Sequence, residues 1–168
     1  MDSPFNGVWN VNMNESREWH ADKERWLPDH VGREVVTVRI DGDRYDFSLE
    51  VGVNPVVHLA YSAELDGDWT PYMCTAIKYP EGLGRAETRD PRTPGANIPE
   101  NKVGEPIAYV KMIRVSPTMH VRISRHPDGQ TLQYTMTSEL TSNNRRVSRV
   151  TSPNGVPLIC RVADRIDY

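Results

Sequence analysis

The sequence predicts an all-β protein, an antiparallel up-and-down barrel of about eight to ten strands with a short N-terminal helical segment and one long loop. Segments in which apolar and polar residues alternate occupy most of the chain, and this period of two is typical of half-buried strands. The dipeptides Asp41-Gly42 and Asp66-Gly67 stand between such segments, and Asp-Gly favours tight hairpins because glycine accepts a positive φ. A long meander of hairpins loses its exposed edges when it closes into a barrel.

The chain of 168 residues has the size of a single domain, 1–168, with a net charge of −3 and a mean hydropathy of −0.60. No apolar run approaches the ~20 residues of a membrane-spanning helix, so we expect no membrane partner. The first residues carry neither a basic nor an apolar signal region, which favours a cytoplasmic location. The sequence leaves the oligomeric state open, a homodimer included.

Residues 14–31 interrupt the alternation near the N-terminus. A short helix fits there, because Pro28 would end it and the spacing of Trp19 and Trp26 places both rings on one helical face. The polar segment 16–32, with its aromatic stripe, is therefore a candidate lid over an opening of the barrel.

Strands are expected over residues 5–12 and near residues 35–40, 44–51, 56–65, 72–79, 106–114, 119–126, 131–141, 145–151 and 157–166. Residues 80–105 contain four prolines and four glycines but few apolar residues. Strands resume on both sides of this stretch, so it is predicted as one long loop within the domain. Loops of such length are usually functional or disordered.

Four short motifs resemble a known family: Phe-x-Gly-x-Trp-x-Val-Asn at 5–12, Val-Thr-Val-x-Ile at 36–40, Tyr-x-Ala-x-Leu-Asp-Gly at 61–67 and Asn-Gly-x-Pro at 154–157. The chain is similar to lipocalin-like (calycin) barrels, and more specifically to a bacterial family of small lipocalin-like domains. The resemblance implies that Trp9 lies across the barrel floor below a cavity for a small, largely apolar ligand. Related barrels bind ligands without chemistry, and a minority are lyases, isomerases or cyclases.

Alternation sorts the side chains of each strand into two faces, and we expect the more apolar face inside. That face carries five tyrosines and one cation, which are Tyr45, Tyr61, Tyr79, Tyr109, Tyr134 and Lys111. The residues His120, Arg122 and Ser124 are expected to point outward. The arginines of the last two strands are likewise expected on a solvated exterior: Arg145, Arg146, Arg149, Arg161 and Arg165.

A lysine inside a barrel loses solvation, so its pKa falls and it can act as a base. We therefore expect Lys111 as general base, with Tyr45 and Tyr134 donating to a developing oxyanion or relaying a proton. A tyrosine-lined apolar cavity suits a small apolar or aromatic ligand. The expected substrate-binding residues are Trp26, Phe47, Tyr61, Tyr79, Tyr109 and Met136.

The sequence thus predicts a cofactor-independent lyase or isomerase that acts on a small aromatic or polyketide-like molecule in the cavity. The alternative is a non-catalytic carrier or sensor of a small apolar ligand. Interior tyrosines also occur as simple core packing, and a lysine near a strand end can reach water. A one-residue bulge would turn Lys111 outward and bring Val110 and Met112 inside instead. These alternatives stay open at the level of sequence.

Other classes of function find little support. Residues 106–168 carry a net charge of +5, but few aromatic residues stand among the basic ones, so nucleic-acid binding is not expected. His20 and Glu24 have metal-ligand spacing, yet two ligands do not define a metal site. No Gly-x-Ser-x-Gly, Walker, Gly-x-Gly-x-x-Gly or His-Glu-x-x-His motif occurs, so we expect neither a metal nor a cofactor.

Overall fold

The computed structural model describes residues 2–29, 32–79 and 102–166. In these ranges it contains no helix and twelve strands: β1 (Gly7–Val11), β2 (Arg17–His20), β3 (Arg25–Pro28), β4 (Glu34–Asp41), β5 (Arg44–Val51), β6 (Val56–Glu64), β7 (Thr70–Lys78), β8 (Pro106–Ser116), β9 (Met119–Arg125), β10 (Leu132–Ser142), β11 (Arg145–Thr151) and β12 (Pro157–Ile166). The predicted loop over 80–105 lies for the most part outside the described residues.

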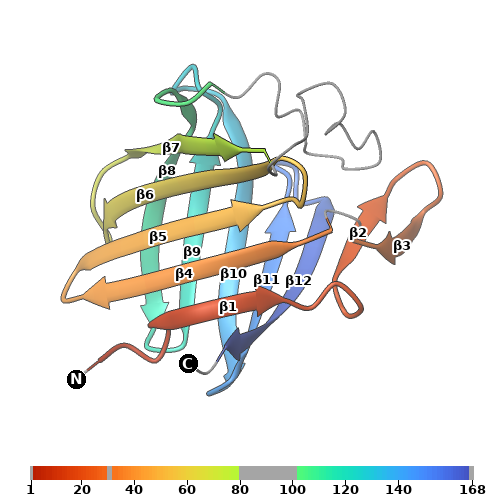
Figure 1. Cartoon of the computed structure of the whole chain (residues 1–168), viewed down its shortest axis with the longest axis horizontal. Helices are drawn as coiled ribbons and strands as arrows, with labels where there is room; N and C mark the ends of the chain where they lie inside the picture. Colours follow the sequence, from red (N-terminus) through yellow and green to blue (C-terminus); the bar gives the residue numbers. More distant parts are fainter. Residues whose placement is uncertain (1, 30–31, 80–101, 167–168) are drawn as a thin grey trace.

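Ten of the twelve strands close into an antiparallel barrel. Neighbouring strands follow the order β1-β4-β5-β6-β7-β8-β9-β10-β11-β12, and β1 pairs with β12 to complete the circle, with Trp9 opposite Arg165. In Figure 1 the strands β1 and β4–β7 cross in front of β8–β12 at a steep angle, as the strand tilt of a closed barrel requires. The predicted all-β barrel and its approximate strand number are confirmed.

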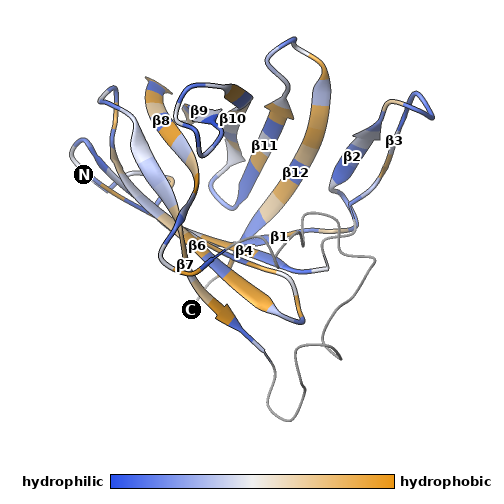
Figure 2. Ribbon diagram, turned by 90° about the horizontal axis from the view of Figure 1, so that it is seen from above, coloured by the Kyte–Doolittle hydropathy of each residue, from blue (hydrophilic) through white to orange (hydrophobic). Residues whose placement is uncertain are grey.

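A β-hairpin stands where the sequence predicted a short helix. β2 pairs with β3 through Trp19 and Trp26, whose rings meet edge to face with centroids 5.6 Å apart. β2 also adds to the barrel by pairing Glu18 with Ile159 of β12. Trp19 and Trp26 can either pair across a hairpin or share one face of a helix, and both arrangements are stabilising. Their spacing alone therefore did not distinguish the two structures. The hairpin projects beside β12 (Figures 1 and 2).

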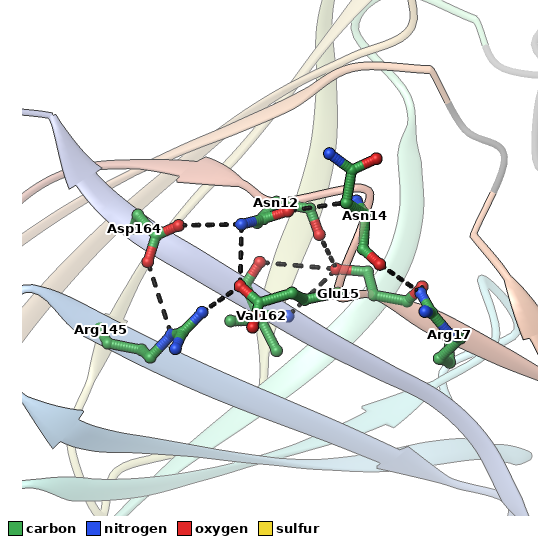
Figure 3. A network of polar contacts seen from close by, with 8 residues as sticks. Asn12, Asn14, Glu15, Arg17, Arg145, Val162 and Asp164 are labelled. Carbon is green, nitrogen blue, oxygen red and sulfur yellow. Dashed lines mark hydrogen bonds and ion pairs between the residues drawn. The ribbon is translucent and has the colours of Figure 1, made fainter.

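A polar network fixes the connection between β1 and β2 to the outside of the barrel (Figure 3). Nδ2 of Asn12 donates to Glu15 at 2.8 Å and to Asp164 at 3.2 Å. Arg145 contacts the same two carboxylates, with its Nε 3.5 Å from Asp164. The backbone N–H of Asn12 donates to the carbonyl of Val162 at 2.7 Å. The base of the hairpin is therefore held against β11 and β12.

One end of the barrel is closed by aromatic side chains. Trp9 is 0% exposed, and its indole N–H donates to the carbonyl of Phe5 at 3.0 Å. The Phe5 ring stacks on His120 with centroids 4.3 Å apart, and Tyr45 meets His120 edge to face. The predicted burial of Trp9 is confirmed, and this cluster forms the floor of the barrel.

Register shifts in β7 change which residues face inward from that strand onward. One shift separates His58 from Leu59 where β6 pairs with β7, and another lies in β7 between Tyr72 and Met73, where that strand pairs with β8. Such irregularities reverse the alternation of side chains. The buried residues of β7 are consequently Tyr72 and Cys74, and Met73 and Thr75 alternate with them on the other face.

The reversed alternation continues into β8, where the predicted catalytic lysine lies. Ala108, Val110 and Met112 are buried, and Tyr109 and Lys111 alternate with them on the outer face. The expectation that Lys111 and Tyr109 face the interior is wrong. The structure instead bears out the alternative in which an irregularity brings Val110 and Met112 inside.

Candidate functional site

The interior of the barrel is far more polar than the sequence suggested. β9 follows the alternation of β8, with Arg122 opposite Met112 and Ser124 opposite Val110, so its polar side chains point inward. His120, Arg122 and Ser124 are buried, which corrects the expectation that they point outward. The apolar residues of the same strand, Met119, Val121 and Ile123, take the partly exposed outer positions. Figure 2 shows hydrophilic bands among the hydrophobic ones along β9, β10 and β11.

Arg122 lies inside the barrel within a cage of aromatic rings. Its guanidinium carbon is 5.2 to 5.8 Å from the centroids of four rings, those of Phe47, Tyr61, Tyr72 and Tyr134. Aromatic faces attract a cation electrostatically, and the attraction grows when water is excluded. The side chain is 7% exposed, and its Nε and Nη1 have no hydrogen-bond partner among the described residues. A buried guanidinium in this state has donors to offer to a ligand.

A second buried arginine lies on β11. Nη2 of Arg146 donates to the hydroxyl of Ser138 at 3.1 Å, and that hydroxyl forms a 2.9 Å hydrogen bond with Ser148. Nε of Arg146 has no hydrogen-bond partner in the described part of the chain. The expectation that Arg146 belongs to a solvated exterior is therefore wrong. Arg145 and Arg149 do lie outside, where they pair with surface carboxylates.

Burial also shifts the protonation of the groups beside these arginines. It raises the pKa values of Tyr45, Tyr61 and Tyr72, so their phenols stay neutral and serve as hydrogen-bond donors rather than as bases. Burial, followed by the charges of Arg114 and Arg146, lowers the pKa of His120 to about 4. The arginines are thus the cations of the interior at neutral pH.

A small pocket with about 30 Å³ of free space, open to solvent at its mouth, lies against Arg146. Four polar residues line it, Glu34, Arg146, Ser148 and Arg161. Six apolar residues complete the wall, Val11, Val36, Phe47, Met136, Val150 and Ala163. Polar groups and apolar groups thus meet in one cavity, which suits a ligand that has both.

At this pocket Arg161 pairs with two carboxylates from different segments. Its Nε lies 3.0 Å from Asp29, directly after β3, and its Nη1 lies 3.0 Å from Glu34 at the start of β4. The side chains of Asp29 and Glu34 are 0% and 6% exposed. Arg161 had been expected on a solvated surface, and this buried ion cluster corrects that expectation.

The structure brings some of the predicted site residues together and separates others. Phe47 and Met136 line the pocket, and Tyr61 and Tyr134 surround Arg122 beside them. Tyr45 stacks on Tyr61 with centroids 6.1 Å apart, on the side of the floor.

The remaining predicted site residues lie elsewhere. Lys111 and Tyr109 are on the outer face of β8, and Trp26 is 40% exposed on β3. Tyr79 directly follows β7 and is not among the residues that line the pocket. No lysine is among the described residues that line this pocket.

The residues that sequence reasoning missed share a signal. His120, Arg122 and Ser124 recur at every second position of β9, and Arg146 and Ser148 do so in β11. A polar set with this spacing marks one complete face of a strand. It was assigned to solvent because the interior was assumed to be apolar.

Within the described residues, no group of three or more His, Cys, Asp and Glu side chains is arranged to hold a metal ion. That part of the chain also has no helix capable of crossing a membrane.

Comparison with known proteins supports the fold. No protein-family model and no curated protein sequence matches the chain. Among solved structures, a fatty acid transporter described as REP1-NXSQ is similar with a TM-score of 0.54 and 12% identity, over 97% of this chain and 96% of that one. The zebrafish ileal bile acid-binding protein in complex with cholic acid is similar with a TM-score of 0.51 and 12% identity, over 98% and 100% of the two chains.

The closed ten-stranded barrel and these likenesses define the fold: the chain has the fold of a lipocalin-like (calycin) barrel. At 12% identity the likeness concerns the fold, and the resemblance to one bacterial family stays a prediction.

Proposed function

We propose that the protein is a non-catalytic carrier or sensor of a small, largely apolar molecule that ends in an anionic group such as a carboxylate. The observation that carries this proposal is Arg122, a buried guanidinium with two nitrogens that find no hydrogen-bond partner among the described residues. A charge removed from water without a counter-ion costs several kcal/mol. A ligand anion that accepts hydrogen bonds from the guanidinium offsets this cost, and planar arginine suits a carboxylate.

The other walls of the site fit the rest of such a molecule. Six apolar residues line the pocket, and one of them, Phe47, also belongs to the ring cage around Arg122. Ser148 and Arg146 supply further donors at the same place. The two similar structures are described as a fatty acid transporter and as a bile acid-binding protein with cholic acid. Both kinds of molecule join a carboxylate to an apolar body, which agrees with this proposal.

The carrier hypothesis has better support than the lyase or isomerase hypothesis. The latter required Lys111 as an interior base, and Lys111 alternates with buried Val110 and Met112 on the outer face. The buried phenols remain neutral, so they do not replace the lysine as bases. A cytoplasmic location, the absence of a nucleic-acid partner and the oligomeric state stay predictions.

Two fluorescent probes with one aromatic skeleton test the proposal. 8-Anilinonaphthalene-1-sulfonate carries a permanent anion, and N-phenyl-1-naphthylamine lacks it. We expect the sulfonate to bind more tightly, and Arg122→Gln to weaken its binding by about tenfold to a hundredfold while the neutral probe changes little. The control is Arg149→Gln, which removes an outer arginine that is 55% exposed. Equal affinity of the two probes for the wild type, or equal losses in both variants, would refute the anionic head group.

A further inference from the structure

The ion cluster of Asp29, Glu34 and Arg161 lies at the pocket but has no part in the function proposed above. Glu34 and Arg161 both line the cavity, and Asp29 anchors the end of the β2–β3 hairpin to the same guanidinium. One cation is therefore shared by two buried carboxylates. Removing either carboxylate charge leaves Arg161 with the other.

Glu34 is surrounded by charged groups from several elements. Arg161 of β12 is its ion-pair partner, and Asp29 shares that partner. Arg146 of β11 and Arg122 of β9 also act on its charge, and Glu18 of β2 acts on Arg161. Burial raises the pKa of Glu34, Arg161 lowers it in part, and Asp29 raises it further. The balance leaves a carboxylate that takes up a proton more readily than one in water.

The charge of Glu34 opposes the ligand chemistry that the arginines favour. An ionised carboxylate in the pocket wall repels an incoming anion, and the low dielectric of the interior strengthens the repulsion. It also occupies Nη1 of Arg161, which lies 3.0 Å from it. A neutral Glu34 would keep its shape, repel no anion and hold Arg161 less firmly.

We propose that Glu34 controls anion binding in this pocket through its protonation, so that the uptake of one proton from solvent accompanies the binding of the anionic ligand. This inference rests on the proposed function, because it assumes an anionic ligand. It adds a regulated affinity: the pocket binds its ligand more tightly as the pH falls through the titration of Glu34, and releases it as the pH rises.

The test uses 8-anilinonaphthalene-1-sulfonate, because its sulfonate stays ionised and the ligand itself does not titrate between pH 5 and 8. We expect the wild type to bind it more tightly at pH 5 than at pH 8, on the order of tenfold. Glu34→Gln should bind more tightly than the wild type at pH 8, with little dependence on pH. The neutral N-phenyl-1-naphthylamine should show no pH dependence in either protein.

The matched control is Glu139→Gln, which removes a carboxylate that is 38% exposed and pairs with Arg149 on the outer surface. It should keep the pH dependence of the wild type. Near-ultraviolet circular dichroism at each pH checks that the barrel stays folded, since partly unfolded acid states bind the sulfonate probe nonspecifically.

Calorimetry of the wild type gives a readout that does not depend on a variant. Binding measured in buffers of different ionisation enthalpy should show uptake of a fraction of a proton near the midpoint of the pH dependence. No proton uptake, or a pH dependence retained in Glu34→Gln, overturns the role of Glu34. In that case the proposed function still holds if the protein prefers the sulfonate probe and this preference depends on Arg122. If the protein shows no such preference, both the proposed function and the role of Glu34 are refuted.

Discussion

Nη2 of Arg122 donates a hydrogen bond to the sulfur of Met136, 3.6 Å away inside the barrel. A thioether is a weak acceptor, so this contact does little to offset the desolvation of a guanidinium. The four surrounding rings supply further attraction, of about 2 kcal/mol or more when desolvated. Burying the charge costs several kcal/mol, and we expect this cost to exceed the attraction of the rings and the sulfur. Arg122 would then lower the stability of the ligand-free protein.

Replacing Arg122 with methionine should accordingly stabilise the ligand-free protein. Methionine fills much of the same space with an apolar chain and adapts to irregular gaps. We expect the free energy of unfolding to rise by about 1 to 4 kcal/mol, measured by urea denaturation without ligand, while the sulfonate probe loses affinity. The surface variant Arg149→Met should change stability by about 0.5 kcal/mol or less. A less stable Arg122→Met would mean that the cage stabilises the charge fully.

Trp9 and Trp26 provide a matched pair for the floor and the hairpin. Trp9→Ala should reduce the free energy of unfolding by about 3 to 5 kcal/mol, because it leaves a cavity in a fully buried cluster. Trp26→Ala should cost about 0.5 to 1.5 kcal/mol, the scale of its ring pair with Trp19. Thermal and urea unfolding of both variants check this order. Similar losses would contradict the assignment of the floor.

Lys111→Met should leave the affinity for both probes unchanged within about twofold, since its side chain lies on the outer face of β8. Fluorescence titration at pH 7 measures this. A large loss of affinity would return Lys111 to the interior and revive the hypothesis of an interior base.

The stability of the barrel should depend on pH through His120, whose pKa is lowered to about 4 in the folded state. The unfolded chain takes up a proton near pH 6.5 and the folded chain only near pH 4, so protonation favours unfolding as the pH falls between these values. Above pH 6.5 the histidine is neutral in both states and this loss is absent. The full loss is on the order of 3 kcal/mol.

His120→Phe keeps a ring against Phe5 and removes the proton, so its unfolding free energy should fall less than that of the wild type between pH 7 and pH 4.5. Urea denaturation at the two pH values measures the difference. The control His126→Gln alters an exposed histidine and should retain the wild-type dependence. If His120→Phe loses as much stability as the wild type, other groups account for the acid sensitivity.

The sequence was sufficient for the barrel and for the inner face of β5 and β6. β5 pairs with both β4 and β6 without a register shift, so simple alternation placed Tyr45, Phe47 and Tyr61 inside. Long uninterrupted alternation shows which face of a strand is buried, and in these strands the apolar residues are the buried ones.

Beyond β6, alternation alone did not show which face of each strand lies inside the barrel. β8 has apolar residues on both faces, so its sequence did not show whether Val110 or Lys111 points inward. The register shifts in β7 determine the inner face of β8 through strand pairing. In β9 the rule that apolar residues lie inside failed, because His120, Arg122 and Ser124 take the inner positions. The residues missed, Arg122 and Arg146 among them, are those to which the proposed function assigns the anionic ligand, and exceptions to local rules are expected at functional sites.

The pairing of β1 with β12 joins Val8 to Ile166, two residues from opposite ends of the described chain. Contacts so distant in sequence are slow to form, because a long loop must close before any of their energy is gained. On a ribosome, most of the sheet can be synthesised while the cavity still lacks its last wall, and Arg161 and Ala163 arrive with that wall. The ability to bind should therefore appear late in folding, in one step with closure of the seam. Recovery of probe fluorescence during refolding would follow the slowest phase of the chain rather than the formation of its first hairpins.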